Sequence, residues 1–258
     1  MAWGTATARV DSDTRWETIP CPVCDHTEFT PLFEKAGEPF VRCNGCRLVL
    51  INPRPVPEQV ATTYDRDYTQ GYIRKQDKKL KRISRWVKRI RKAYVPQGRW
   101  LDIGCSAGFV VHCARQAGFD AWGVDIEPNA IEFARSHFGL DNVFTGALEE
   151  RGFPNAHFDV ISAYELIEHV PDVNRLLQEI RRLLAPGGVV EIRTPDAGHW
   201  RVRNRLETWE AVLPSEHLYY FSRDSLSRLL KNHGLEIIRQ RVSLKPGLKI
   251  YATHAGAP

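Results

Sequence analysis

From Arg99 to the C-terminus, short apolar runs alternate with amphipathic segments. Apolar runs of this length, bounded by turn-forming residues, predict buried strands. The expected strands are Arg99–Gly104, Asp120–Ile126, Asn142–Thr145, Phe158–Tyr164 and Gly188–Thr194. The expected helices between them are Ala107–Ala117, Pro128–Phe138 and Val173–Leu184. Strands joined through helices predict an α/β fold, in which helices cover both faces of a mostly parallel sheet.

The C-terminal pattern differs from this alternation. An irregular stretch, Asp196–Ser222, is followed by an expected helix at Arg223–His233. Two strand-like runs come next, Leu235–Leu244 and Leu248–His254, with Lys245-Pro246-Gly247 between them. So short a connection predicts an antiparallel hairpin that finishes one edge of the sheet.

The same patterns divide the chain into four parts. Residues 1–18 form a polar tail with little to bury, and residues 19–57 form a compact module rich in proline and cysteine. Residues 58–98 are expected to be a basic helical segment, and residues 99–258 carry the α/β pattern. Within the third part, an apolar stripe at spacings of three and four indicates an amphipathic helix and consists of Leu80, Ile83, Val87, Ile90 and Tyr94.

The junction between the first expected strand and its helix carries the strongest chemical signal. Gly104 and Gly108 let the backbone turn sharply and approach a ligand, and the helix N-terminus adds unpaired N–H groups. Asp125 ends the second strand twenty-one residues beyond Gly104, where a carboxylate can accept hydrogen bonds from both hydroxyls of a ribose. The acid Asp102 suits a cationic methionine end better than a pyrophosphate. These residues predict an adenosine-containing cofactor.

With these motifs in place, residues 100–194 resemble the class I S-adenosylmethionine-dependent methyltransferases, whose fold is Rossmann-like. The resemblance rests on the loop at 101–109, on Gly146-Ala147-Leu148, on the strand and loop at 158–170, and on the Pro-Gly-Gly turn at 186–188. It implies that Asp102, Gly104 and Gly108 surround the methionine part of the cofactor and that Asp125 holds the ribose. The expected cofactor-binding residues are Asp102, Gly104, Cys105, Ser106, Gly108, Asp125, Ile126, Ala147, Leu148 and Tyr164.

Four of the six cysteines form two Cys-x-x-Cys pairs, Cys21/Cys24 and Cys43/Cys46, with eighteen residues between the pairs. Each pair points two thiolates at one centre, and two pairs complete the tetrahedron that zinc prefers. This spacing predicts a zinc ribbon with a structural Zn²⁺, because four thiolates leave no open position. A module of this size is expected to need the metal in order to fold.

The net charge of +5 comes from one segment. Residues 74–92 contain eleven Lys or Arg and one acid, Asp77, so the remainder of the chain is acidic. The segment is expected to be a solvated helix whose stripe packs over the cofactor site. There are three alternatives. The helix could bind an anionic substrate, it could bind RNA, or residues 73–94 could contact a membrane surface, where Trp86 joins the stripe.

Composition narrows the class of protein without naming a substrate. Hydrophobic residues at 43% and charged residues at 26% are ordinary for a soluble globular protein. The first residues lack a basic flank followed by an apolar run, and no apolar stretch approaches the ~20 residues that span a bilayer. A cytoplasmic location is therefore expected, and the oligomeric state is left open.

Histidine is the expected general base if the methyl acceptor carries a proton. His217, next to Glu216 in the stretch after the fifth strand, is the leading candidate, and the pair is expected to be catalytic. A Glu-His pair resembles one in a zinc-containing subgroup that methylates carbons of nucleotide-linked deoxysugars, whose members carry a further C-terminal domain. His169 is expected to form the pocket wall, and His199 is a weaker candidate.

The sequence therefore predicts S-adenosylmethionine-dependent methyl transfer to an oxygen or carbon of a small-molecule biosynthetic intermediate, such as a sugar or a nucleotide-linked sugar. Two alternatives stay open. One is an RNA methyltransferase that uses the zinc ribbon and the basic helix, and the other is a non-catalytic, zinc-stabilised binding protein.

Overall fold

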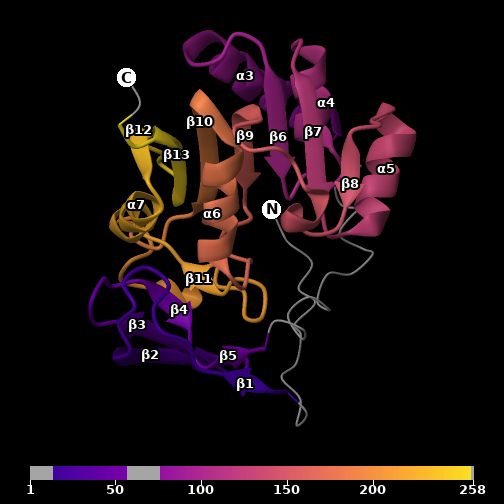
Figure 1. The fold of residues 1–258 in the computed structure, drawn as a ribbon. Coiled ribbons are helices and arrows are strands. Elements are labelled where there is room, and N and C mark those ends of the chain that lie inside the picture. The colour runs from indigo at the N-terminus through magenta and orange to yellow at the C-terminus, as the bar shows by residue number, and fades with distance from the viewer. Residues whose placement is uncertain (1–13, 57–75, 257–258) are drawn as a thin grey trace.

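The computed structural model describes residues 14–56 and 76–256. The central sheet is built from β6 (Arg99–Ile103), β7 (Asp120–Asp125), β8 (Val143–Thr145), β9 (Phe158–Tyr164), β10 (Leu184–Pro195), β12 (Leu235–Gln240) and β13 (Gly247–His254). Their spatial order is β12–β13–β10–β9–β6–β7–β8 (Figure 1). The strands from β10 to β8 run parallel, whereas β13 is antiparallel to β10 and to β12. The predicted parallel sheet and its C-terminal hairpin are confirmed.

Helices cover both faces of this sheet. One face carries α3 (Gln76–Ala93), α4 (Phe109–Gln116) and α5 (Pro128–Phe138), and the other carries α6 (Val173–Leu183) and α7 (Arg223–Asn232). Successive strand residues point to opposite faces, so Trp100 and Val160 pack with α3–α5 while Leu101 and Ile161 pack with α6 and α7. This explains why the strands read as continuous apolar runs.

Local capping explains why two helices begin where the sequence predicts. Pro128 is the first residue of α5, and the Glu127 carboxylate accepts a hydrogen bond of 2.9 Å from the Asn129 amide. Before α6, the Asp172 carboxylate accepts from the Arg175 amide at 2.9 Å. The fifth expected strand begins earlier than predicted, because Leu184 already pairs with Phe158 before the register shifts at the Pro-Gly-Gly turn.

The cysteine module forms a second sheet that borrows a strand from the other end of the chain. Its strands are β2 (Phe29–Lys35), β3 (Glu38–Cys43), β4 (Val49–Ile51) and β11 (Tyr219–Tyr220), in the order β11–β4–β3–β2. The module expected at 19–57 is therefore not self-contained, and the stretch 196–222 is not wholly irregular. In Figure 1 the indigo module lies beneath α7 and the orange β11.

The polar tail expected over residues 1–18 is described only from residue 14 onward. Residues 1–13 lie outside the described part, and Trp16–Glu17 forms β1, paired with β5 (Arg54–Pro55). The pairing holds because the Glu17 carboxylate accepts a hydrogen bond of 2.8 Å from the Arg54 guanidinium, which also donates to the Tyr219 hydroxyl at 2.6 Å. Arg54–Pro55, at the proline-rich end of the module, is thus extended and bonded to Tyr219 of β11.

The basic helix is confirmed over Gln76–Ala93, while residues 58–75, with Arg74 and Lys75, lie outside the described residues. Ile83, Val87 and Ile90 are buried against α4 and the sheet. These stripe residues are therefore covered by protein, while much of the basic face is exposed, and membrane contact through residues 73–94 stays a prediction. Among the helices described, none is both long and apolar enough to traverse a bilayer.

Candidate functional site

Three loops at the carboxyl ends of β6, β7 and β8 meet at Asp125. Its carboxylate accepts hydrogen bonds from the Ser106 amide at 2.7 Å and from the Glu127 amide at 2.9 Å. Its carbonyl accepts from the Gly146 amide at 2.9 Å. Because a carboxylate has about four lone-pair positions, two remain for the hydroxyls of a ribose. The structure thus brings the expected ribose-binding acid together with the loops of both neighbouring strands.

The two glycines of the first loop have different steric roles. Both adopt left-handed conformations, with φ of 70° at Gly104 and 73° at Gly108. A Cβ at Gly108 would lie 2.7 Å from the Cβ of Ala134 and 2.8 Å from Leu140, so this glycine allows α4 to pack against α5. A Cβ at Gly104 would lie 3.0 Å from Leu166, in the loop after β9. Gly104 therefore brings the first loop against the loop that follows the fourth parallel strand.

Asp102 is buried beneath this loop in an apolar environment. Its carboxylate accepts a hydrogen bond of 2.5 Å from the Ser162 hydroxyl, which in turn accepts from the Trp100 indole N–H at 2.9 Å. Burial raises the pKa of Asp102 to about 8, and the bond from Ser162 opposes that rise only in part. An acid kept mostly neutral by burial, although Arg193 opposes the rise, is suited to a cationic ligand, because a further cation favours its ionised form.

The remaining expected cofactor residues lie at the same edge of the sheet but present different groups. Cys105 is buried and would contact any Cβ added at Gly123, which means that its side chain packs against β7. Leu148 is buried, and the Ala147 amide donates to the Glu150 carboxylate at 3.1 Å. Ile126 is 53% exposed, so it offers an apolar surface beside Asp125 to a planar ring.

Tyr164 ends β9 within a buried charged cluster under α3. Its hydroxyl donates to Glu191 at 2.5 Å, and Glu191 also accepts from the Arg193 guanidinium at 2.8 Å. That guanidinium lies 3.5 Å from the centroid of the Trp86 ring and 4.4 Å from that of Tyr164. The hydroxyl of Tyr164 is thus engaged by protein, and the cluster ties α3 to the ends of β9 and β10.

Two histidines from different loops face each other, the buried His217 and the half-buried His169. The rings of His169 and His217 lie 4.5 Å apart between centroids and meet edge to face. The Nδ1 atom of His169 is 2.8 Å from the Glu216 carbonyl, and that of His217 is 2.8 Å from the Ala211 carbonyl. A carbonyl only accepts hydrogen bonds, so each Nδ1 carries the hydrogen and the neutral ring keeps a lone pair on Nε2.

Both histidines are held in their neutral form. Burial lowers the pKa of His217 to about 3, with His169 adding to the shift, and burial lowers the pKa of His169 to about 4. The unprotonated ring is therefore present throughout the neutral range. This satisfies the first requirement for the general base that the sequence predicts at His217.

Glu168, which the sequence reasoning did not single out, is the carboxylate beside this pair. Its Oε2 accepts a hydrogen bond of 3.0 Å from the Thr194 hydroxyl, whereas its Oε1 is buried with no hydrogen-bond partner among the described residues. One potential ligand or proton-accepting atom from each of Glu168, His169 and His217 lies within 4.8 Å of the others. Burial raises the pKa of Glu168 well above its usual range. Its position directly before His169 was the available sequence signal.

Glu216 contributes its backbone rather than its side chain to the histidine pair, since its carbonyl accepts from His169. The segment that contains Glu216 and His217 is held in place by a residue of the cysteine module. Glu38 on β3 is fully buried, and its carboxylate accepts hydrogen bonds from both the amide (2.7 Å) and the hydroxyl of Ser215. Ser215 has φ of 62°, an uncommon conformation for a residue with a side chain. Glu38 therefore fixes the backbone two residues before His217.

His199, the weaker candidate, lies elsewhere. Its Nε2 is 3.2 Å from the carbonyl of Ser243, in the loop between β12 and β13. No described contact joins it to the pair formed by His169 and His217. The structure thus gives His199 a role in fastening two loops together.

The four module cysteines gather at one centre. The Sγ atoms of Cys21 and Cys46, and those of Cys24 and Cys43, are 3.4 Å apart, and all four lie within 4.8 Å of one another. Tetrahedral zinc with bonds of about 2.3 Å separates its sulfur ligands by about 3.8 Å, close to these values. The two turns also share one backbone pattern, in which the amides of Asp25 and Arg47 donate to the carbonyls of Cys21 and Cys43. The donor set and its geometry fit a tetrathiolate metal site.

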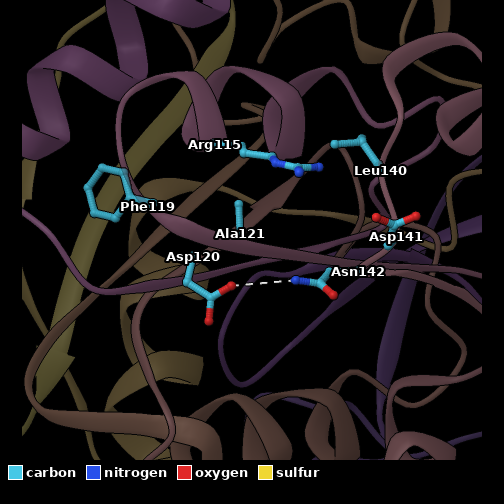
Figure 2. A pocket seen from close by; sticks show the side chains of 7 residues that line it. All are labelled: Arg115, Phe119, Asp120, Ala121, Leu140, Asp141 and Asn142. Carbon is cyan, nitrogen blue, oxygen red and sulfur yellow. Dashed lines mark hydrogen bonds between the residues drawn. The ribbon is translucent and has the colours of Figure 1, made fainter.

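A separate pocket lies at the amino-terminal end of β7 (Figure 2). It is lined by Arg115, Phe119, Asp120, Ala121, Leu140, Asp141 and Asn142. Asp120 begins β7 whereas Asp125 ends it, so the pocket and the acid expected to bind the ribose are separated by the length of the strand. The amide of Asn142 lies 3.4 Å from the Asp120 carboxylate (Figure 2). The pocket is therefore not part of the cofactor site.

Solved structures share this architecture. An S-adenosylmethionine-dependent methyltransferase from Methanosarcina mazei superposes with a TM-score of 0.52 at 19% identity and covers 61% of this chain and 92% of its own. A protein from Pyrococcus horikoshii gives a TM-score of 0.57 at 20% identity, with coverage of 67% and 90%. At these identities the likeness defines the fold, an α/β sheet of the methyltransferase type.

A family model described as a methyltransferase domain matches residues 72–240, and the chain belongs to this family. The protein is an S-adenosylmethionine-dependent methyltransferase. Among curated relatives, a ubiquinone biosynthesis O-methyltransferase from an Azoarcus species is 29% identical, over 59% of this chain and 70% of the relative. One from Bordetella avium is 33% identical, over 37% and 42%. The cysteine module lies outside the residues that the family model matches.

Proposed function

We propose that the protein transfers a methyl group from S-adenosylmethionine to a hydroxyl oxygen, or an acidic carbon, of a small-molecule biosynthetic intermediate. When bound, the donor supplies a methyl group on a positively charged sulfur. The names of the curated relatives, O-methyltransferases of a small molecule, support an oxygen acceptor. A sugar or a nucleotide-linked sugar, as the sequence suggests, is the finer proposal within this class.

The observation that carries the proposal is the buried group formed by Glu168, His169 and His217. It lies just beyond Leu166, whose side chain packs against the cofactor loop at Gly104. A neutral imidazole at this place can accept a proton from an acceptor hydroxyl as the new bond forms. The chain's contribution to the reaction is therefore to hold the acceptor in line and to receive its proton.

The shifted pKa values of His217 and Glu168 have the same physical cause, which is burial without a counter-charge. Transfer of a proton to His217 creates an imidazolium next to a carboxyl group that can ionise. An imidazolium at His217 and an ionised Glu168 stabilise each other, so His217 is a stronger base in the form of the protein in which Glu168 has already released its proton to solvent. Glu216 holds His169 through its carbonyl, and Glu38 sets the backbone before His217.

The test is the variant His217→Ala. Formation of S-adenosylhomocysteine is measured with catechols and nucleotide-linked sugars as acceptors, and donor affinity is measured separately by calorimetry. Loss of a general base should lower kcat by roughly 10²–10⁴-fold while the donor dissociation constant stays the same. His137→Ala, at an exposed histidine on α5, is the control. Wild-type turnover in His217→Ala would remove this residue from the mechanism.

We also propose that Cys21, Cys24, Cys43 and Cys46 bind one structural Zn²⁺. Support comes from the spacing of the four sulfurs and from the matching backbone turns around the two pairs. Four thiolates leave no position for a substrate, so the metal would shape the module rather than take part in methyl transfer. Elemental analysis of the purified protein should give one zinc per chain.

A further inference from the structure

Three of the five large apolar side chains that are exposed among the described residues lie on two neighbouring loops. Trp200 follows β10 and is 64% exposed, and Val242 and Leu244 lie between β12 and β13 and are 98% and 74% exposed. The hydrogen bond between His199 and the Ser243 carbonyl joins the two loops at this point. We call Trp200, Val242 and Leu244 the apolar tip.

The exposure of Trp200 is not the result of a loosely packed loop. The residues that follow it, Val202, Leu206 and Trp209, are buried in an apolar cluster with Phe40 and other residues of the cysteine module. The loop therefore has its own core, and Trp200 is the large apolar residue that this core leaves outside. A side chain of that size in water has an unfavourable hydration free energy, which a partner surface would remove.

The two loops of the tip are rich in basic residues, although Asp196 lies at the start of the first loop and accepts from the Gly198 amide. Residues 197–206 and 237–246 contain six Arg or Lys and no acid: Arg201, Arg203, Arg205, Arg239, Arg241 and Lys245. The Arg201 guanidinium lies 4.8 Å from the centroid of the Trp200 ring, which places a positive charge directly at the tip. An occupant must therefore accept apolar side chains and carry negative charge around them.

We infer that the apolar tip docks the protein on an anionic lipid bilayer. Tryptophan and aliphatic side chains insert at the boundary between headgroups and acyl chains, while arginine and lysine contact anionic headgroups. A second copy of this chain fits less well, because a symmetric contact would place the same arginines opposite one another. A nucleic acid would match the charge but would leave Val242 and Leu244 in water.

The tip lies at the same edge of the sheet as the candidate site. Gly247, just beyond the loop with Val242 and Leu244, pairs with Pro195 at the end of β10. The neighbouring Thr194 donates to Glu168. Docking would thus hold the carboxyl-end edge of the sheet near the lipid. The inference does not depend on the proposed function, because lipid binding is measured without the methyl donor or an acceptor.

The experiment is sedimentation of the full chain with vesicles of phosphatidylcholine alone and of phosphatidylcholine with phosphatidylglycerol. The wild-type protein should sediment with the anionic vesicles only, and less so at high salt. Each basic residue near the surface contributes about fivefold in partitioning, so Arg201→Gln with Arg241→Gln should weaken it by roughly 25-fold. The triple variant Trp200→Ser, Val242→Ser and Leu244→Ser should also lose anionic-vesicle binding.

Ile126→Ser is the matched control, since Ile126 is also exposed but follows β7, which is separated from β13 by three strands. This variant should sediment like the wild type. Failure of the wild type to bind anionic vesicles would overturn the inference, as would unchanged binding by the triple variant. A dimer in solution that the triple variant abolishes, without vesicle binding, would also overturn it and assign the tip to a second copy.

Discussion

The donor side and the acceptor side of the candidate site are assembled over very different distances along the chain. On the donor side, the Ser106 amide bonds to Asp125 across 19 residues, and both belong to consecutive strand-to-helix loops. On the acceptor side, Glu38 bonds to Ser215 across 177 residues, and His169 bonds to Glu216 across 47. One side is local to a single fold unit, whereas the other requires two parts of the chain to come together.

This difference separates two functions within one molecule. The donor side rests on β6, β7 and β8 and has no described hydrogen bond to the cysteine module. The acceptor side depends on that module, because β11 is the fourth strand of the module's sheet and Glu38 lies on β3. Damage to the module should therefore remove the acceptor side and leave donor binding in place.

The largest expected effect is that of Cys43→Ser, which removes one of the four module thiols. Because a structural metal contributes its binding free energy to folding, the module should lose more than about 4 kcal/mol of stability. Hydrogen exchange should then show the amide of Tyr220 unprotected, as β11 loses its partner β4, whereas the amide of Tyr219 keeps its bond to the Glu168 carbonyl. Donor affinity, measured by calorimetry, should change by less than about twofold, as expected for sites without shared partners.

The control for this variant is Cys113→Ser, which alters a cysteine on α4 and outside the module. It should keep protection at β11 and keep one zinc per chain. If Cys43→Ser removed donor binding together with the protection of β11, the donor side and the acceptor side would form one cooperative unit. Their structural independence would then be contradicted.

Asp125→Ala addresses the donor side alone. Loss of charged hydrogen bonds to the ribose hydroxyls should weaken donor binding by about 1–3 kcal/mol. Loss of the carboxylate also frees the amides of Ser106 and Glu127, so the loop should lose order as well. Asp120→Ala, at the exposed start of the same strand, is the control and should bind the donor normally. Unchanged affinity in Asp125→Ala would contradict the ribose-binding role.

The same contrast explains what the sequence could predict. The bounds of β9 and α5 match the sequence-based expectation, because each depends on neighbours within a few residues: an apolar run in one case, and Pro128 with a capping carboxylate in the other. The stripe of α3 was also predicted, since its period is a property of the helix alone.

The acceptor side could be predicted only in part. His217 was expected as a candidate, but its neighbours Glu168 and Glu38 were not singled out. A two-residue strand such as β11 carries too little periodicity to be recognised, and its pairing with β4 depends on chain segments far apart. Likewise, nothing in the sequence of β3 distinguishes the buried Glu38 from the exposed Glu34 on β2. Only the tertiary contact with Ser215 makes that difference.

A smaller effect is expected from Glu38→Gln, which tests the link between the two parts of the chain. The amide group of glutamine can replace one acceptor oxygen but turns a donor toward Ser215, so about 1–3 kcal/mol of local stability should be lost. Because His217 is displaced, kcat should fall while the donor dissociation constant stays constant. Glu34→Gln, on the adjacent strand, is the control. A variant that folds less stably but keeps wild-type kcat would show that Glu38 supports the fold alone.

The smallest effect, release of one proton, concerns the donor side again. Burial raises the pKa of Asp102 to about 8, so at pH 7 its carboxyl group is mostly protonated in the free protein. The positive charge of the methionine part favours the ionised carboxylate, which lowers this pKa and sends a proton to the buffer. Donor binding at pH 7 should therefore be more exothermic in Tris than in phosphate, because Tris has the larger ionisation enthalpy, and this difference should vanish at pH 9, where Asp102 is already ionised.

Asp102→Asn keeps an oxygen for the Ser162 hydroxyl but cannot release a proton. Its binding enthalpy should be the same in both buffers. Burial also raises the pKa of Asp125, so a buffer dependence that persists in Asp102→Asn would assign the proton to Asp125 instead. Equal enthalpies in the wild type would mean that the methionine part does not approach Asp102. The measurement thus locates the cationic end of the donor without reference to the acceptor side.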